Sequence, residues 1–454
     1  GFPSGTAANQ VVILDITEPY SPILLQNPGL LPDASGGVAV EFEAPAGSSR
    51  FALQYLPTMA SPDPVALVPL PEPSDILVGN PLRRIYVTYP EFNSSLQPLV
   101  NHRGMGTYLL NPQAAFDAFS LGRNDPEALR AALSWVVRES PVRSPLPNVL
   151  LVGHSSFDPN NVLGHFSGNQ LPVYYEKSFP TTIGELEVAV DYPYSVLLPG
   201  DELPDVRLGR VPAKTTSDLD KFVARQLAYE AIGSTLFNSS RGGYLIADVA
   251  VEFQDDQPRW QALWTATGRT ATLLNSNDSN GAPEKAAIVS ALSTAPGMAL
   301  VLYNGHGNTN RWGGPNIFTA TELNASTTQN QWPVVATFTC LNGYYAFPGL
   351  SSPSLCELWL FSDVTKGAIA NVAPVGVDNY GNQSAFTERF LEAYGTNPST
   401  VGAAFTAALS DFALDFPSNT ATRHEFVLFG DPETPLFLNA VTGLSTEDWK
   451  TLNH

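Results

Sequence analysis

Runs of apolar residues are spaced along nearly the whole chain, and the spacing changes once. Near the start, residues 9–16, 36–44 and 49–56 run or alternate apolar, which is typical of strands. Proline and glycine separate these stretches, and residues 57–75 are rich in proline. We therefore predict a β-rich N-terminal domain with its linker over residues 1–75.

From residue 76 onward, apolar strands alternate with amphipathic segments. The segment 124–140 is typical of a helix, because Asp125 can cap it, Pro126 suits its first turn and apolar residues follow at helical spacing. The expected strands are 83–90, 106–111, 147–156, 205–213, 242–250, 297–307, 332–340 and 367–376, and the other expected helices are 93–104, 216–231, 257–268, 284–293 and 354–363. This alternation predicts an α/β fold with mainly parallel strands.

We expect this α/β part to form two successive half-sheets with their helices. The predicted subdomains are 76–240 and 241–445, followed by a tail at 446–454. A chain of 454 residues with 43% hydrophobic residues can bury several cores.

Charge and cysteine content exclude several classes of protein. The formal net charge of −20 argues against a basic face for nucleic acid or anionic lipid. An acidic surface either keeps the protein soluble or attracts basic substrates and cations. Two cysteines cannot form a disulfide scaffold, and no run of 18 apolar residues indicates a membrane span. The first residues have no charged n-region and no apolar h-region, so we expect any signal peptide to be absent or already removed. Abundant proline with few lysines and cysteines is consistent with an exported protein.

Two predicted strands end in chemically capable residues. His306 stands between two glycines after the strand that ends at Tyr303, and Cys340 ends the strand that begins at Val334. Ligands of open parallel sheets bind at the carboxyl ends of strands. If these two strands are neighbours joined by a right-handed crossover, both side chains emerge at the same edge of the sheet.

A thiol beside an imidazole predicts acyl transfer. The imidazole lowers the pKa of the thiol and later protonates the leaving amine. The main-chain amides of Gly307 and Cys340 are then candidate donors to an oxyanion. The alternative is a small apolar cysteine in the core and an ordinary Gly-His-Gly turn.

Several motifs together resemble the gingipain family of cysteine peptidases, which have a caspase-like fold. The resemblance covers about residues 76–440, in the segments 83–110, 116–136, 147–159, 190–230, 303–314, 338–349 and 424–438, which follow the family order. Because a β-rich region precedes the catalytic part, the likeness extends to the branch that contains type IX secretion sortases. The resemblance implies that Cys340 is the nucleophile, that His306 is the general base and acid, and that the Gly307 and Cys340 amides form the oxyanion hole.

The resemblance also implies an acid that orients the histidine. Asp248 and Glu252, in and after the strand 242–250, are the two candidates, and Asp248 is nearer the strand end. The alternative is a solvated loop carboxylate.

Gingipains cut after a basic residue, which implies an acidic pocket. Asp255 and Asp256 precede the predicted helix 257–268, where a carboxylate would pair with arginine or lysine of the substrate. Tyr380 is the candidate for an aromatic wall. The alternative for the two acids is an N-cap that favours the helix dipole.

Calcium is the one ion that the resemblance implies, as a structural ion and not as part of the chemistry. The oxygen donors in acidic loops are Asp158, Asp191, Asp201, Glu202 and Asp205. No stretch has a complete calcium-loop spacing, so acids of structural turns are the alternative. His154 departs from the family pattern, and we do not expect it to bind metal.

The sequence therefore predicts a secreted or cell-surface cysteine endopeptidase that acts on protein or peptide substrates, with cleavage after basic residues and an association with a secretion system or cell surface as further expectations. The alternatives are dedicated sortase-like processing or transpeptidation, and a non-catalytic surface or binding protein on the same scaffold.

Overall fold

The computed structural model describes most of the chain. The described residues are 2–17, 23–58, 76, 82–139, 146–165, 170–180, 186–233, 241–277, 281–314, 316–327, 332–350, 352–396 and 398–437. Most of the proline-rich linker and the predicted tail 446–454 lie outside them. Two compact units make up the chain, Gly1–Pro69 and Leu70–His454. The finer division at residues 240 and 241 stays a prediction.

The first unit is built from short antiparallel strands. Its three-stranded sheet has the order β2-β1-β5, and β3 pairs with β4 in a separate hairpin. The strands are β1 Val11–Asp15, β2 Ile23–Leu25, β3 Gly29–Pro32, β4 Val38–Glu41 and β5 Phe51–Tyr55. The β-rich character predicted for this region is confirmed.

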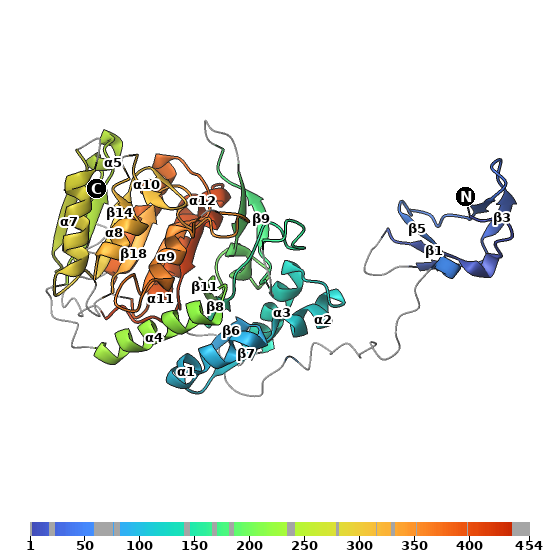
Figure 1. The fold of residues 1–454 in the computed structure, drawn as a ribbon, viewed down its shortest axis with the longest axis horizontal. Coiled ribbons are helices and arrows are strands. Elements are labelled where there is room, and N and C mark those ends of the chain that lie inside the picture. The colour runs from blue at the N-terminus through green and yellow to red at the C-terminus, as the bar shows by residue number, and fades with distance from the viewer. Residues whose placement is uncertain are drawn as a thin grey trace. The chain divides into compact units, whose positions relative to one another are not determined.

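The second unit is an α/β structure around one ten-stranded sheet (Figure 1). The order of its strands is β13-β12-β14-β18-β19-β20-β11-β8-β6-β7. The strands are β6 Arg84–Thr88, β7 Thr107–Leu110, β8 Asn148–Val152, β11 Arg207–Val211, β12 Gly243–Ala247, β13 Ala271–Asn275, β14 Leu300–Asn304, β18 Val334–Phe338, β19 Ala370–Pro374 and β20 Phe426–Phe429. The predicted α/β class is confirmed, and the two expected half-sheets join into a single sheet.

Twelve α-helices accompany this sheet in the described part of the chain. They are α1 Asn93–Arg103, α2 Pro112–Ser120, α3 Pro126–Glu139, α4 Thr216–Ile232, α5 Val251–Asp255, α6 Gln257–Thr265, α7 Ala282–Ser293, α8 Ala320–Ala325, α9 Leu355–Phe361, α10 Tyr380–Gly395, α11 Val401–Asp415 and α12 Thr420–Glu425. Smaller strands form a hairpin, β9 Tyr174–Lys177 with β10 Glu187–Val190, and a three-stranded group, β15 Gly307–Asn308, β16 Arg311–Trp312 and β17 Phe318–Thr319.

The sheet consists of two parallel blocks that run in opposite directions. We call β6, β7, β8, β11 and β20 the first block, and β12, β13, β14, β18 and β19 the second block. Within each block all neighbours are parallel, whereas β19 and β20 pair antiparallel. The carboxyl ends of the two blocks therefore lie at opposite edges of the sheet.

Successive side chains of a strand point to opposite faces, and helices cover both faces of the second block. Leu300 and Leu302 of β14 pack in the same cluster as Trp260 of α6. Val301 and Tyr303 of the same strand pack in another cluster, which contains helices α7, α8 and α9. Because both faces are covered, these strands are apolar throughout, which is the pattern that made them visible in the sequence.

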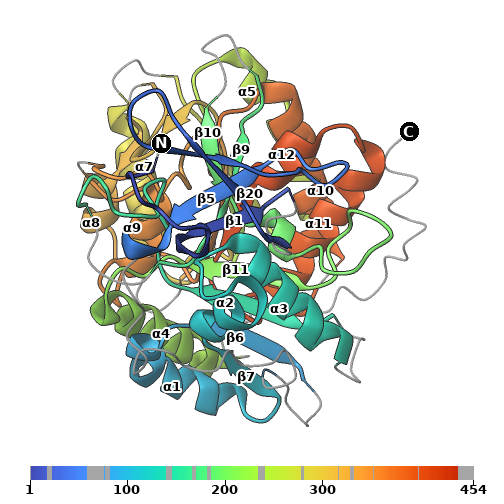
Figure 2. The same ribbon diagram turned by 90° about the vertical axis from the view of Figure 1, so that its right-hand side faces the viewer.

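The first block has the same layered build. One face packs against α1 and α4, and the other packs against α2 and α3 (Figure 2). Every strand and helix predicted from residue 83 onward is present, with ends that differ by a few residues. The prediction did not name the helices α2, α5, α8, α10, α11 and α12, nor the strands β9, β10, β13, β15, β16, β17 and β20.

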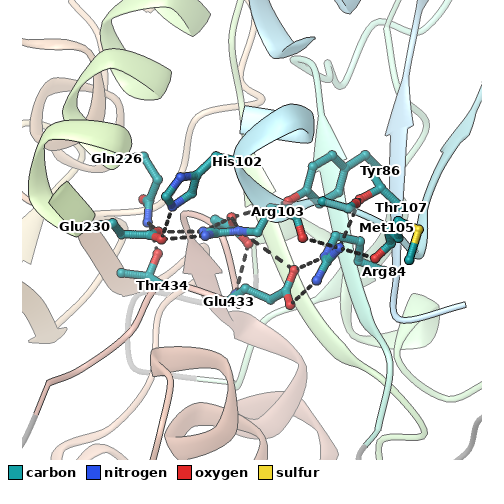
Figure 3. A network of polar contacts seen from close by, with 12 residues as sticks. Arg84, Tyr86, His102, Arg103, Met105, Thr107, Gln226, Glu230, Glu433 and Thr434 are labelled. Atoms are coloured by element: carbon teal, nitrogen blue, oxygen red, sulfur yellow. Dashed lines mark hydrogen bonds and ion pairs between the residues drawn. The ribbon is translucent and has the colours of Figure 1, made fainter. Parts of the chain in front are cut away.

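A network of buried ion pairs joins the segment after β20 to the first block (Figure 3). Arg103, at the end of α1, donates to both carboxylate oxygens of Glu230 in α4, at 2.6 and 2.7 Å, and to Asp431 at 2.7 Å. The guanidinium of Arg84 in β6 donates through Nε and Nη2 to the two carboxylate oxygens of Glu433. Burial alone acts to raise the pKa of Glu230, but the bonds and charge of Arg103 lower it overall.

Candidate active site

The ends of β14 and β18 bring His306 and Cys340 to the same edge of the sheet. The two strands are parallel neighbours, with Asn304 opposite Phe338. The loops that follow them are in direct contact, because a Cβ on Gly307 would collide with Oγ1 of Thr339 and lie 3.2 Å from the main-chain oxygen of Cys340. Glycine is therefore required at position 307 for this close approach.

The main chain of His306 is held on two sides. Its N–H donates to Oδ2 of Asp248 at 3.1 Å, and its carbonyl oxygen accepts from the Tyr303 hydroxyl at 2.6 Å. A side chain at Gly305 would collide with both of these groups. The imidazole is exposed and lies edge-to-face on Phe253, with ring centroids 5.1 Å apart. The ring is thus free to face a substrate while its main chain is fixed.

The two candidate orienting acids lie in different surroundings. Asp248 is fully buried after β12 and accepts from the main-chain N–H of Val249 at 2.8 Å as well as from that of His306. Its carboxylate therefore fixes the loop that carries the histidine. Glu252 is exposed in the first turn of α5, next to Phe253.

Cys340 is a free, half-buried thiol. Its Sγ lies 3.8 Å from the main-chain oxygen of Asp378 and 4.0 Å from Nε2 of Gln383, which also donates to Thr339 at 2.8 Å. Burial raises the pKa of the thiol, and the charges of Asp378 and Glu425 raise it further, against hydrogen bonds that lower it. Among the described residues, the amide of Cys340 has no hydrogen-bond acceptor.

The residue after the cysteine has a strained backbone. Leu341 has a φ of +63°, a left-handed value that is unfavourable for a residue other than glycine, asparagine or aspartate. Its N–H donates to the carbonyl oxygen of Gly376 at 2.9 Å, which holds the chain in this turn. Backbone strain of this kind clusters at functional sites.

Asn342 joins the two loops, and the sequence reasoning did not identify this role. Its Nδ2 donates to the main-chain oxygen of Asn308 at 2.6 Å, and its Oδ1 accepts from the indole N–H of Trp312 at 2.7 Å. Trp312 stacks on Tyr303 with centroids 4.8 Å apart. Gln383 was missed as well, because it lies in the unpredicted helix α10. The only available indication was the Asn-Gly pair directly after the cysteine strand.

The structure brings Asp256 and Tyr380 together. Asp256 accepts hydrogen bonds from the hydroxyls of Tyr380 and Ser384. It occupies the N-cap position of α6, but its side chain makes no capping hydrogen bond there. Tyr380 also lies edge-to-face on Phe253, which in turn contacts His306. Asp255 is exposed and is not part of this group.

The five candidate calcium ligands do not form a cluster. Each has a partner within the protein: three accept main-chain N–H groups of loops, and two pair with arginines. Asp158 accepts from Val162 and Leu163, Asp201 from Leu203, Asp205 from Leu197 and Leu198, Asp191 pairs with Arg210, and Glu202 pairs with Arg423. In the part of the chain that the structure describes, no three His, Cys, Asp or Glu side chains are placed to hold a metal ion. A calcium site stays a prediction.

None of the helices in the described part of the chain combines the length and the apolar character that crossing a bilayer requires.

Comparison with known proteins gives one family and several similar structures. Peptidase family C25 matches residues 79–437. The crystal structure of the Arg-specific cysteine proteinase gingipain R is similar with a TM-score of 0.61 at 19% identity, over 78% of each chain. The complex of the pro- and mature domains of RgpB from Porphyromonas gingivalis gives a TM-score of 0.60 at 19% identity, over 78% of this chain and 80% of that one. No curated protein sequence matches.

Proposed function

The chain belongs to peptidase family C25 and is a cysteine peptidase, and we propose that it cleaves peptide bonds with Cys340 as nucleophile and His306 as general base. The observation that carries this assignment is the contact between the loops after β14 and β18, where Gly307 lies against Thr339 and Cys340. Cys356, the other cysteine, is fully buried in α9 and is not accessible to a substrate.

The proposed reaction starts with attack of Sγ on the carbonyl carbon of the substrate. As the S–C bond forms, the imidazole of His306 takes the thiol proton, and the carbonyl electron pair moves to oxygen. The N–H groups of Gly307 and Cys340 are the proposed donors to this oxyanion. Support comes from the Cys340 amide, which has no acceptor among the described residues.

Collapse of this intermediate releases the amine and leaves a thioester. The imidazolium gives its proton to the leaving nitrogen, and water then attacks the thioester with the imidazole again as base. We assign Asp248 to hold the His306 main chain, because its carboxylate accepts from that N–H. For Glu252, a contact with the imidazole stays a prediction.

We propose that Asp256 determines a preference for a basic residue before the cleaved bond. Its carboxylate lies at the end of a row of contacts that runs from His306 through Phe253 and Tyr380. A guanidinium or ammonium group that reached it would gain a charged partner in a partly buried place. Arg259, 3.5 Å from the other carboxylate oxygen, competes for the same charge.

A second use of the same thioester is transpeptidation, in which an amine instead of water completes the reaction. Dedicated processing of secreted proteins would need the same groups, and so both remain alternatives within the cysteine peptidase class. Action outside the cell or at its surface is part of the proposal, and fractionation of the source cells tests it.

The decisive experiment is cleavage of a mixed fluorogenic peptide library, with and without calcium, and with Cys340→Ala as blank. We expect cleavage after arginine or lysine that disappears in the blank. Asp256→Asn should lower kcat/KM for such peptides by roughly 10²-fold, the loss of about one charged hydrogen bond, whereas the matched variant Asp255→Asn should change little. Equal cleavage by Cys340→Ala would refute the nucleophile, and cleavage after other residues would refute the acidic pocket.

A further inference from the structure

Two buried carboxyl groups carry charges that raise the pKa of the Cys340 thiol. Asp378 follows β19, and Glu425 is the last residue of α12. Only 7% of the surface of Asp378 and 1% of that of Glu425 is exposed. The main-chain oxygen of Asp378 lies 3.8 Å from Sγ. These acids therefore belong to the surroundings of the thiol, although no motif in the sequence pointed to them.

Hydrogen bonds fix the carboxylate of Asp378. It accepts from the hydroxyl of Thr422 at 2.5 Å, from Nδ2 of Asn382 at 2.7 Å and from the main-chain N–H of Asn379 at 2.7 Å. All three donors are neutral. Among the described residues, the carboxylate is thus held in place by neutral donors alone.

Glu425 is fixed against the turn that follows the cysteine. Its Oε1 accepts from the N–H of Phe179 at 2.8 Å, while its Oε2 is buried and has no hydrogen-bond partner among the described residues. The carboxyl group fills the space beside Gly376, where any side chain would collide with it. The carbonyl oxygen of Gly376 accepts a hydrogen bond from the N–H of Leu341. Gly376 therefore contacts both the carboxyl group of Glu425 and the turn that follows Cys340.

The charges around this pair are negative. Within the described residues, none of the groups that contact the two carboxyls or shift their pKa values is a cation, and Glu176 adds a further negative charge. His424, the nearest imidazole along the chain, contacts Glu176 at 2.8 Å and stacks on Tyr192. Burial raises the pKa of Asp378 to about 6, and burial together with the charge of Asp378 raises the pKa of Glu425 to about 9. Near neutral pH the pair therefore keeps one proton.

We propose that Asp378 and Glu425 are positioning residues that keep the thiol of Cys340 protonated until a substrate is attacked. This inference rests on the proposed function, in which Cys340 is the nucleophile. The free enzyme then holds a protonated thiol, and the proton passes from Sγ to His306 as the S–C bond forms. A preformed thiolate would be destabilised by the negative charge of this pair, which no cation offsets among the described groups that act on the two carboxyls.

The test is the pH dependence of alkylation of Cys340 by iodoacetamide in the full chain. The adduct is located by peptide mass mapping, and the buried Cys356 is an internal reference that should stay unmodified. The proteins are the wild type, Asp378→Asn, Glu425→Gln and the control Asp411→Asn. Asp411 lies in α11 and also has a pKa raised by burial, but it is not among the groups that act on the thiol.

We expect slow alkylation of the wild type at neutral pH, with a midpoint above the ordinary thiol range. Asp378→Asn removes a charge that is present at neutral pH and should speed alkylation there by up to roughly tenfold, since one pKa unit is a tenfold change in thiolate. Glu425→Gln removes a charge that forms only in alkali, so its profile should depart from the wild type mainly there. Asp411→Asn should follow the wild type.

Two results would overturn the inference. The first is fast alkylation of the wild type that persists into acid, which indicates a preformed thiolate. The second is a set of profiles in which both variants coincide with the wild type. If Asp378→Asn does not fold, Glu425→Gln decides alone, because its amide oxygen still accepts from Phe179.

Alkylation needs no turnover and so separates this inference from the proposed function. Peptide cleavage that survives in Cys340→Ala refutes the nucleophile whatever the alkylation shows. An inactive Cys340→Ala with coincident alkylation profiles refutes only the role of the two acids.

Discussion

Two strands of the sheet are followed by the same Gly-His pair, but the two histidines lie in different surroundings. In the first block β8 is followed by Gly153 and His154, and in the second block β14 is followed by Gly305 and His306. Both strands are buried along their whole length. A Gly-His pair after an apolar strand is therefore not by itself evidence of catalysis.

His154 is enclosed by the protein. Only 3% of it is exposed, and its ring lies edge-to-face on Tyr345 with centroids 5.4 Å apart. Burial lowers its pKa well below the ordinary value, and the charges of Lys214 and Arg210 lower it further. This histidine is a neutral part of the core, whereas His306 has an exposed ring.

The third residue of each motif explains much of the difference. Ser155 follows His154 and is buried, whereas Gly307 follows His306 and leaves room for the Thr339–Cys340 segment. The comparison indicates that a Gly-His pair can take part in chemistry only where the residue after the histidine is small enough for the end of a second strand to come close.

The largest expected effect separates the two histidines by activity. His306→Ala should lower kcat/KM by roughly 10³-fold or more, because the proposed base is lost. Its thermal unfolding should stay near that of the wild type, since the ring is exposed. Steady-state kinetics and a melting curve check both parts, and an active His306→Ala would remove the distinction between the two motifs.

His154→Ala should show the opposite pattern. The deletion of a buried ring leaves a cavity and should cost about 2–4 kcal/mol of unfolding free energy. The folded fraction should keep its kcat. Denaturant titration measures the first quantity, and activity normalised to active-site titration measures the second. A stable but inactive variant would place His154 in the chemistry.

Gly307→Ser tests the third position by making the second motif resemble the first. The added side chain collides with Thr339 and should push the two loops apart. We expect kcat to fall by roughly 10- to 100-fold, because small displacements of reacting groups cost about this much. Gly314→Ser is the matched control, since a Cβ at Gly314 meets nothing within 4 Å. Equal losses in both variants would show that the contact has no special role.

The smallest effect is a pH dependence of stability. The pKa of His154 is lower in the folded state, so the unfolded chain binds more protons below about pH 6.5, and stability falls as the pH falls through that range. The difference in unfolding free energy between the wild type and His154→Ala should therefore shrink in acid, by at most about 1.4 kcal/mol per pH unit. Parallel curves would mean that His154 is protonated in the fold.

Local patterns predicted much of the fold because strands covered on both faces are apolar throughout. The runs 147–156 and 297–307 were visible for that reason. The helices α10 and α11 were not named, although they are long, and β20 was quoted only inside a motif. The opposite directions of the two blocks could not be predicted from the sequence, because the antiparallel pairing of β19 with β20 depends on contacts between distant segments.

Part of the candidate site was predictable as well. Strand ends gave His306 and Cys340, and their proximity follows from the pairing of β14 with β18. Asp378, Gln383 and Glu425 could not be found, because they act on the thiol from segments that follow β19 or precede β20. Burial decides their chemistry, and a single sequence does not display burial of isolated polar residues.

The position of β20 has a consequence for how the protein is made. β20 is formed by residues 426–429 but lies between β19 and β11 in the sheet. Among the described strands, the pairing of β19 with β20 is what joins the two blocks. Gly343, three residues after the cysteine, packs against Phe429, and Arg103 pairs with Asp431. Both contacts need residues at or directly after β20. Nearly all of the described residues must therefore be synthesised before the sheet beside the thiol can be completed, so we expect peptidase activity to begin only after that point.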